Sequence, residues 1–173
     1  MCDFVHHLDN KFIIFNRYIN IVLLLVQLHN RIEVKNMDVQ ILFGAEEIKQ
    51  IYEKTLSAKN LDIVCLADKY SEVIGDYFDK RYAPQLFGSK IITREILPDN
   101  PENRGDAKTK DGTKNQVRFI KIIKPSESDL LLFDSKAVLI SYNQKAPIAL
   151  VISDLAIVTN LENQFEGLWG KRN

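Results

Sequence analysis

The sequence predicts an α/β fold, in which a single domain holds a mixed β-sheet with flanking helices and an N-terminal hydrophobic helix precedes it. Three observations predict this class: two units of strand then helix open the domain, closely spaced strands follow, and an amphipathic helix ends the chain. With 173 residues, 46% of them hydrophobic, the chain can bury a core without disulfide or metal support. We therefore expect one domain over residues 37–173 and a separate extension or dimerisation helix over residues 1–36.

The most apolar stretch of the chain is 12–28, and it does not fit a membrane span. A span needs about 20 mostly apolar residues, whereas polar side chains interrupt this stretch at Asn16, Arg17 and Asn20. The basic leader and small-residue cleavage site of a signal peptide are missing. Apolar residues recur instead at helical spacing, at Phe12, Phe15, Ile19, Val22 and Val26. This pattern favours a helix that pairs two chains; a helix packed on its own domain and a membrane-associated segment are the alternatives.

Two units of strand and helix open the domain. The apolar run Val39–Phe43 predicts a strand, and apolar residues at helical spacing predict an amphipathic helix over 45–56. Leu61–Ala67 is rich in aliphatic residues, which is typical of a strand buried on both faces. A second helix is expected over 69–83, where Pro84 stops it.

A strand over Lys90–Leu97 leads into the least apolar stretch of the domain. Residues 98–116 hold no aliphatic side chain larger than that of Ala107, so they cannot bury enough apolar surface to fold alone. We expect a long mobile loop there, either disordered or serving as a lid or contact loop.

The end of the chain predicts a meander and a helix. Closely spaced strands are expected at Val117–Ile123, Asp129–Phe133, Lys136–Ser141 and Ile148–Ile152. Asp134–Ser135 fits a tight turn between the middle pair. Ser153 is expected to cap the last helix, whose apolar stripe runs from Leu155 to Trp169.

Charge and cysteine content narrow the classes of function. The 23 Lys and Arg residues balance 23 Asp and Glu residues, so no overall attraction to nucleic acid or anionic lipid is expected. Cys2 and Cys65 are too few for a disulfide framework, which fits free thiols in a reducing compartment. We therefore expect a cytoplasmic protein that does not bind membranes.

All three histidines, His6, His7 and His29, precede the expected domain. A Ser-His-Asp or Cys-His arrangement needs an imidazole base, and most zinc sites use His or several Cys. Cys65 lies inside an apolar strand and is expected to be a buried, unreactive thiol. We therefore expect no catalytic residue of these kinds, no bound metal and no cofactor.

Acidic residues near predicted strand ends leave one catalytic alternative open. Asp68, Asp129 and Asp134 would form the site of a metal- or carboxylate-dependent hydrolase if they converged around one cation. Phosphodiesters or sugars would be its substrates. Solvated loop acids are the simpler interpretation, since nothing in the sequence sets the separation of these groups.

Three segments carry a resemblance to a known family: VQILFGAEEIKQIYEKTL, DLLLFDSKAVLIS and PIALVISDLAIVTNLENQFEGLW. Their order and apolar spacing resemble the effector domain of TrmB-family transcriptional regulators, which is built on a phospholipase D-like fold. The resemblance implies a single phospholipase D-like domain over 37–173 that acts in transcription regulation, with residues 1–36 supplying at most a linker helix that pairs two chains.

The phospholipase D superfamily carries His-x-Lys-x4-Asp followed by Gly-Ser-x-Asn, and this sequence departs from both motifs. If Asp134 takes the position of the motif's Asp, Glu127 takes that of the nucleophile and Asp129 that of the phosphate-binding Lys. The second motif becomes Ser141-Tyr142-Asn143-Gln144. Acids at these positions would repel a phosphodiester, so the resemblance implies the fold without its chemistry.

Regulators of this family usually join a winged helix for DNA to an effector domain that binds a small molecule, often a sugar. The chain has no room for the winged helix, so DNA contact is expected only through a separate protein or a missing domain. Strand-end position and polarity nominate Asp68, Asn143 and Ser153 as ligand-binding residues. We expect a non-catalytic ligand-sensing domain that acts as a homodimer; the hydrolase and a membrane-associated adaptor are the alternatives.

Overall fold

The computed structural model describes residues 38–124 and 126–170. The expected hydrophobic helix, with its dimerisation seam over 12–28, lies outside these residues. The chain divides into two units, Met1–Met37 and Asp38–Asn173, and the fold below is that of the second unit. Within the described residues, no helix combines the length and apolar character that crossing a membrane requires.

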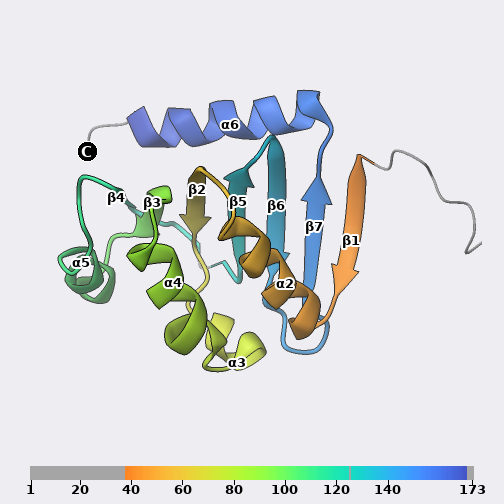
Figure 1. Cartoon of the computed structure of the whole chain (residues 1–173), viewed down its shortest axis with the longest axis horizontal. Coiled ribbons are helices and arrows are strands. Elements are labelled where there is room, and N and C mark those ends of the chain that lie inside the picture. Colours follow the sequence, from red (N-terminus) through yellow and green to blue (C-terminus); the bar gives the residue numbers. More distant parts are fainter. Residues whose placement is uncertain (1–37, 125, 171–173) are drawn as a thin grey trace, which may run out of the picture. The chain divides into compact units, whose positions relative to one another are not determined.

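A mixed sheet forms the centre of this unit (Figure 1). It has seven strands in the order β1-β7-β6-β5-β2-β3-β4. Their bounds are β1 (Val39–Phe43), β2 (Asn60–Cys65), β3 (Ile92–Pro98), β4 (Asn115–Ile120), β5 (Ser128–Phe133), β6 (Lys136–Ser141) and β7 (Ile148–Ile152). Strands β2, β3 and β4 pair in parallel, whereas β5, β6 and β7 pair as antiparallel neighbours. The expected mixed sheet is confirmed. The expected meander is formed by β5, β6 and β7 only, because β4 pairs in parallel with β3 at the edge of the sheet.

Helices cover both faces of the sheet (Figure 1). Over one face lie α2 (Ala45–Thr55), α3 (Tyr70–Ile74), a π-helical turn η1 (Phe78–Tyr82) and α4 (Ala83–Gly88), and α6 (Leu155–Gly170) packs on the other. The alternation of side chains along β2 sends Leu61 and Ile63 toward α2 and Val64 toward α6. Strand β2 is therefore buried on both faces, as its composition predicts.

The expected helix over 69–83 is wrong in two respects. Helix α3 ends at Ile74, after five residues. The next residue, Gly75, has a φ of 61°, and this positive φ interrupts a right-handed helix. Pro84 does not stop a helix either, since it lies in the first turn of α4, where a missing N–H costs no hydrogen bond.

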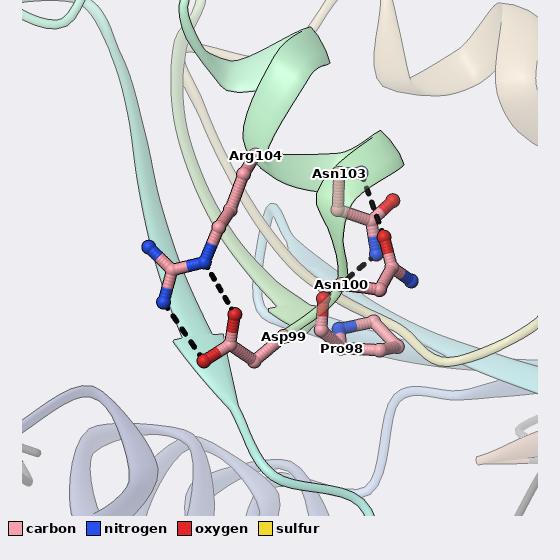
Figure 2. A network of polar contacts seen from close by, with 5 residues as sticks. All are labelled: Pro98, Asp99, Asn100, Asn103 and Arg104. Atoms are coloured by element: carbon pink, nitrogen blue, oxygen red, sulfur yellow. Dashed lines mark hydrogen bonds and ion pairs between the residues drawn. The ribbon is translucent and has the colours of Figure 1, made fainter.

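The expected mobile loop over 98–116 contains the helix α5 (Pro101–Ala107). Asn100 caps it, accepting a hydrogen bond from the Asn103 N–H at 2.8 Å, and Asp99 pairs with Arg104 through contacts of 2.5 and 2.8 Å (Figure 2). Composition misled the prediction because capping and ion pairing, rather than apolar burial, hold this short helix.

Two predictions for the end of the chain had contrasting outcomes. Asp134 and Ser135 adopt φ values of 47° and 56° between β5 and β6, which confirms the predicted tight turn. Ser153 is not the cap of α6, because the carboxylate of Asp154 accepts the bond from the Ile157 N–H at 2.8 Å. Leu155 is 68% exposed, so the apolar stripe of α6 starts later than expected.

Candidate functional site

Strand direction gathers one set of loop residues at a single edge of the sheet. Strands β2, β3, β4 and β6 point the same way, while β5 and β7 run against them. The carboxyl ends of β2, β3 and β6 therefore meet the start of β5 at this edge. Ligand sites of open α/β sheets commonly lie at such an edge.

Asp129, at the start of β5, is buried there and is 5% exposed. Its Oδ1 atom accepts hydrogen bonds from the backbone N–H groups of Leu66 and Ala67, at 2.9 and 3.0 Å. Burial raises the pKa of Asp129 to about 6, although these two bonds and the Tyr142 hydroxyl act to lower it. The carboxylate thus holds the segment that follows β2, and it is not free to bind a ligand.

Buried hydroxyl groups continue from Asp129 into the core. The hydroxyls of Tyr142 and Tyr52 contact each other. Thr55 donates to the Tyr52 carbonyl at 2.7 Å, so the Tyr82 hydroxyl donates to Thr55 Oγ1 at 2.6 Å. Burial raises the pKa of Tyr52 and of Tyr142 well above the usual value. These phenols stay protonated at neutral pH and serve as hydrogen-bonding groups of the core.

A buried ion pair involves Glu95, in the middle of β3. Lys110 Nζ contacts Glu95 Oε2 at 2.7 Å, and the two side chains are only 10% and 7% exposed. Lys110 Nζ also lies 4.4 Å from the centre of the Phe87 ring. Burial raises the pKa of Glu95. The Oε1 atom of Glu95 is buried and has no hydrogen-bond partner.

Two cavities open at this edge. The larger has a volume of about 560 Å³, and the ends of β2 and β3, the helices α3 to α5 and residues 109–111 enclose it. Glu95, Lys110 and the capping residue Asn100 all line it. The smaller has a volume of about 330 Å³ and lies beside the loop that follows β6. Each is within the size range of a small-molecule site.

The three ligand-binding residues expected from the sequence lie in three different places. Asp68 lines the larger cavity and Asn143 lines the smaller one. Ser153 lines neither of them. It follows β7, which runs against β2 and β6, so it lies at the opposite edge of the sheet. Strand direction explains why the three residues are not brought together.

Residues assigned to both phospholipase D motifs lie at the open end of the β5–β6 hairpin, whereas Asp134 lies in the turn at its closed end. The Tyr142 N–H donates to the Glu127 carbonyl at 2.8 Å, which extends the pairing of the two strands. Glu127, Tyr142, Asn143 and Gln144 line the smaller cavity. The side chain of Gln144 donates to Glu72. Residues from both motif segments therefore line one cavity, with acidic and neutral side chains in it.

The acids of the expected hydrolase alternative do not converge. Asp129 starts β5 and Asp134 follows its other end, so about 17 Å of extended strand separates them. Among the described residues, no three His, Cys, Asp or Glu side chains are grouped so that they could hold a metal ion. Burial raises the pKa of the Cys65 thiol well above its usual value, which favours the unreactive form.

Sequence reasoning missed Glu95 and Lys110. A signal for Glu95 was present in the apolar segment Ile91–Leu97. Glu95 lies on the same face of this strand as Thr93, and both residues are buried. Lys110 gave no such signal. It follows a helix that composition did not predict, and its partner lies 15 residues earlier in the chain.

Comparison of the sequence with protein-family models and with curated proteins finds no match. Solved structures do match the fold. TrmBL2, an archaeal chromatin protein with a novel mode of DNA binding, has a TM-score of 0.52 at 16% identity, over 97% of this chain and 65% of that chain. This chain thus spans just under two thirds of TrmBL2.

Two further solved structures have a similar fold. NucT from Helicobacter pylori has a TM-score of 0.57 at 11% identity, over 76% of this chain and 95% of that chain. Nuc from Salmonella typhimurium, a phospholipase D family member, has a TM-score of 0.50 at 10% identity, over 76% of this chain and 93% of that chain. The phospholipase D-like fold expected from the sequence is confirmed, and its link with a TrmB-like protein is supported.

Proposed function

We propose that the domain formed by residues 37–173 is a non-catalytic regulatory domain that binds a small molecule in the 560 Å³ cavity. The observation that carries this proposal is the state of Asp129. If Asp134 takes the position of the motif's Asp, Asp129 takes that of the phosphate-binding lysine, and this buried carboxylate accepts hydrogen bonds at Oδ1 from the Leu66 and Ala67 N–H groups. A phosphodiester approaching it would meet negative charge and no nucleophilic imidazole.

The cavity beside this position supports a binding role. Leu66 and Ala67, which Asp129 holds in place, line the 560 Å³ cavity together with Asp68. The helix α5 closes another side of it, and this helix is held by its cap and ion pair rather than by an apolar core. A ligand that contacts both sides would stabilise the folded arrangement of the cavity, which is how occupancy could regulate a partner.

Assembly as a homodimer belongs to the same proposal. In the described part of the chain, β1 forms one edge of the sheet, and on it Ile41 and Phe43 are 51% and 71% exposed. Leu139 on β6, 38% exposed, shares a cross-strand row with Ile41 through Leu150 of β7. This exposed apolar row supports contact with a second copy, in a cytoplasmic regulator that reaches DNA through another protein or domain.

Hydrolysis and ligand binding are tested on the full 173-residue chain. We expect no turnover of bis(p-nitrophenyl) phosphate or of single-stranded DNA, with or without divalent metal ions. We also expect a rise in the thermal midpoint with at least one member of a panel of sugars, amines and nucleotides. Phosphodiester turnover at a rate that Glu127→Gln abolishes would overturn the non-catalytic assignment.

The homodimer is tested by light scattering on the full chain and on Phe43→Lys. Phe43 is largely exposed, so a lysine there should leave the folded domain intact, as circular dichroism would check. We expect the wild type to be dimeric and the variant to dissociate at least tenfold more readily, because lysine cannot bury its charge in the contact. A wild-type monomer at micromolar concentration would overturn the dimer, and an equally stable variant dimer would exclude the β1 surface.

A further inference from the structure

One buried oxygen atom of a residue that lines the larger cavity lacks the partner that its burial demands. Glu95 is 5% exposed and lines the cavity. Its Oε2 atom is paired with Lys110 at 2.7 Å, but its Oε1 atom has no hydrogen-bond donor. Nearly all buried carboxylate oxygens in proteins have a donor, because an unsatisfied one loses its hydration without replacement. The nearby Thr93 hydroxyl acts to lower the pKa of Glu95 but makes no hydrogen bond to Oε1, so this oxygen can still accept a donor.

The charge around this atom indicates what kind of donor would be bound. The cavity lining lies wholly within the described residues, and it carries six carboxylates against a single ammonium group. The carboxylates belong to Asp68, Asp79, Glu95, Glu102, Asp106 and Asp111. The ammonium group is that of Lys110, which is already paired with Glu95. A cation is attracted to such a lining and an anion is repelled from it.

The apolar part of the lining is also suited to an organic cation. Tyr70, Phe78 and Phe87 contribute aromatic rings to the cavity. The Tyr70 and Phe78 ring centres lie 4.7 Å apart, and Phe87 already has an ammonium group 4.4 Å from its ring centre. Aromatic faces attract ammonium groups, and they also cover the methylene groups that an inorganic ion lacks. Among the described residues, no three His, Cys, Asp or Glu side chains are grouped as a metal site, and the aromatic rings favour an organic cation.

We propose that the cavity binds a small organic amine, whose ammonium N–H donates to Glu95 Oε1 while its hydrocarbon part lies against the aromatic rings. This inference rests on the proposed ligand-binding function and names the chemical class of the ligand. A neutral sugar could donate a hydroxyl to Glu95, but it would leave the remaining carboxylates without a counter-charge. Inorganic phosphate would add negative charge to the cavity.

The test measures binding to the full chain by isothermal titration calorimetry and thermal shift. The probes are 1,4-diaminobutane, n-butylamine, maltose and inorganic phosphate. We expect 1,4-diaminobutane to bind, n-butylamine to bind more weakly, and affinity for both to fall as the salt concentration rises. In Glu95→Gln the affinity for the diamine should fall tenfold or more, because a charge-assisted hydrogen bond is lost.

Two further variants keep the test decisive if Glu95→Gln fails to fold. Asp68→Asn and Asp106→Asn change exposed lining residues, so they should fold normally and still weaken diamine binding several-fold. Asp134→Asn, in the turn at the far end of β5, is the matched control and should bind as the wild type does.

The outcomes separate this inference from the function on which it rests. Diamine binding that the lining variants weaken and the control leaves unchanged supports it. Maltose binding without amine binding overturns the amine assignment and leaves the ligand-binding function standing. Amine binding that is equal in all lining variants places the amine elsewhere and also overturns the assignment. If no member of the wider sugar, amine and nucleotide panel binds, both proposals fall.

Discussion

Replacing Asp129 by asparagine should stabilise the protein at neutral pH and remove part of its pH dependence. Asp129 is 5% exposed, and its pKa of about 6 in the folded protein compares with 3.8 for an ordinary aspartate. Between these two values the folded state keeps a proton that the unfolded state has lost. Stability therefore falls as the pH rises through this window, and the full cost of the buried charge is present above it.

The size of the effect follows from the two pKa values. A folded-state pKa of about 6 against 3.8 corresponds to about 3 kcal/mol at pH 8. Asparagine does not ionise, yet its Oδ1 atom can still accept from the Leu66 and Ala67 N–H groups. Asp129→Asn should therefore gain stability relative to the wild type as the pH rises. The difference between their free energies of unfolding should be about 3 kcal/mol larger at pH 8 than at pH 3.5.

Urea denaturation followed by circular dichroism, at pH steps from 3.5 to 8, measures this difference. Glu95, whose pKa burial also raises, contributes equally to both proteins and cancels. Asp129→Ala is the matched control: it also removes the charge but leaves two N–H groups without their acceptor, so it should be about 2 kcal/mol less stable than Asp129→Asn at every pH. A difference between Asp129→Asn and the wild type that stays constant across the pH range would refute the reasoning.

Two other changes test how the helices are held. Arg94 contacts Asp62 through two bonds of 2.7 and 2.6 Å and Glu166 of α6 at 2.7 Å, so Arg94→Ala should lower the free energy of unfolding by about 2 kcal/mol in urea titrations. An unchanged midpoint would mean that apolar packing alone holds α6. Asn100→Ala removes the cap of α5 and should weaken hydrogen-exchange protection over 101–107 by about 1 kcal/mol. Protection elsewhere should not change, and equal loss across the domain would contradict a local cap.

The site shows where sequence reasoning reaches its limit. The sequence placed Asp68 and Asn143 at strand ends, and both line cavities at the edge where β2, β3 and β6 end. It could not place Ser153, because the edge on which a strand end lies depends on the direction of pairing, which no residue of the strand encodes. Glu95 and Lys110 escaped notice for a related reason. Their contact depends on α5, which precedes Lys110 in the chain. This helix can be recognised by its cap and not by its composition.

The sequence alone determined the order of most elements and the chemistry that the domain lacks. The spacing at which apolar residues recur is a local property of the sequence, so the strands and the first and last helices could be recognised from neighbouring residues. The histidine positions, all before residue 37, exclude imidazole chemistry from 37–173 without any structure. Only the tertiary structure decided which groups meet: Asp129 with the backbone 62 and 63 residues before it, and Glu95 with Lys110 beside an open cavity. Contacts between segments depend on strand order, direction and packing, and these are properties of the whole fold rather than of any one segment.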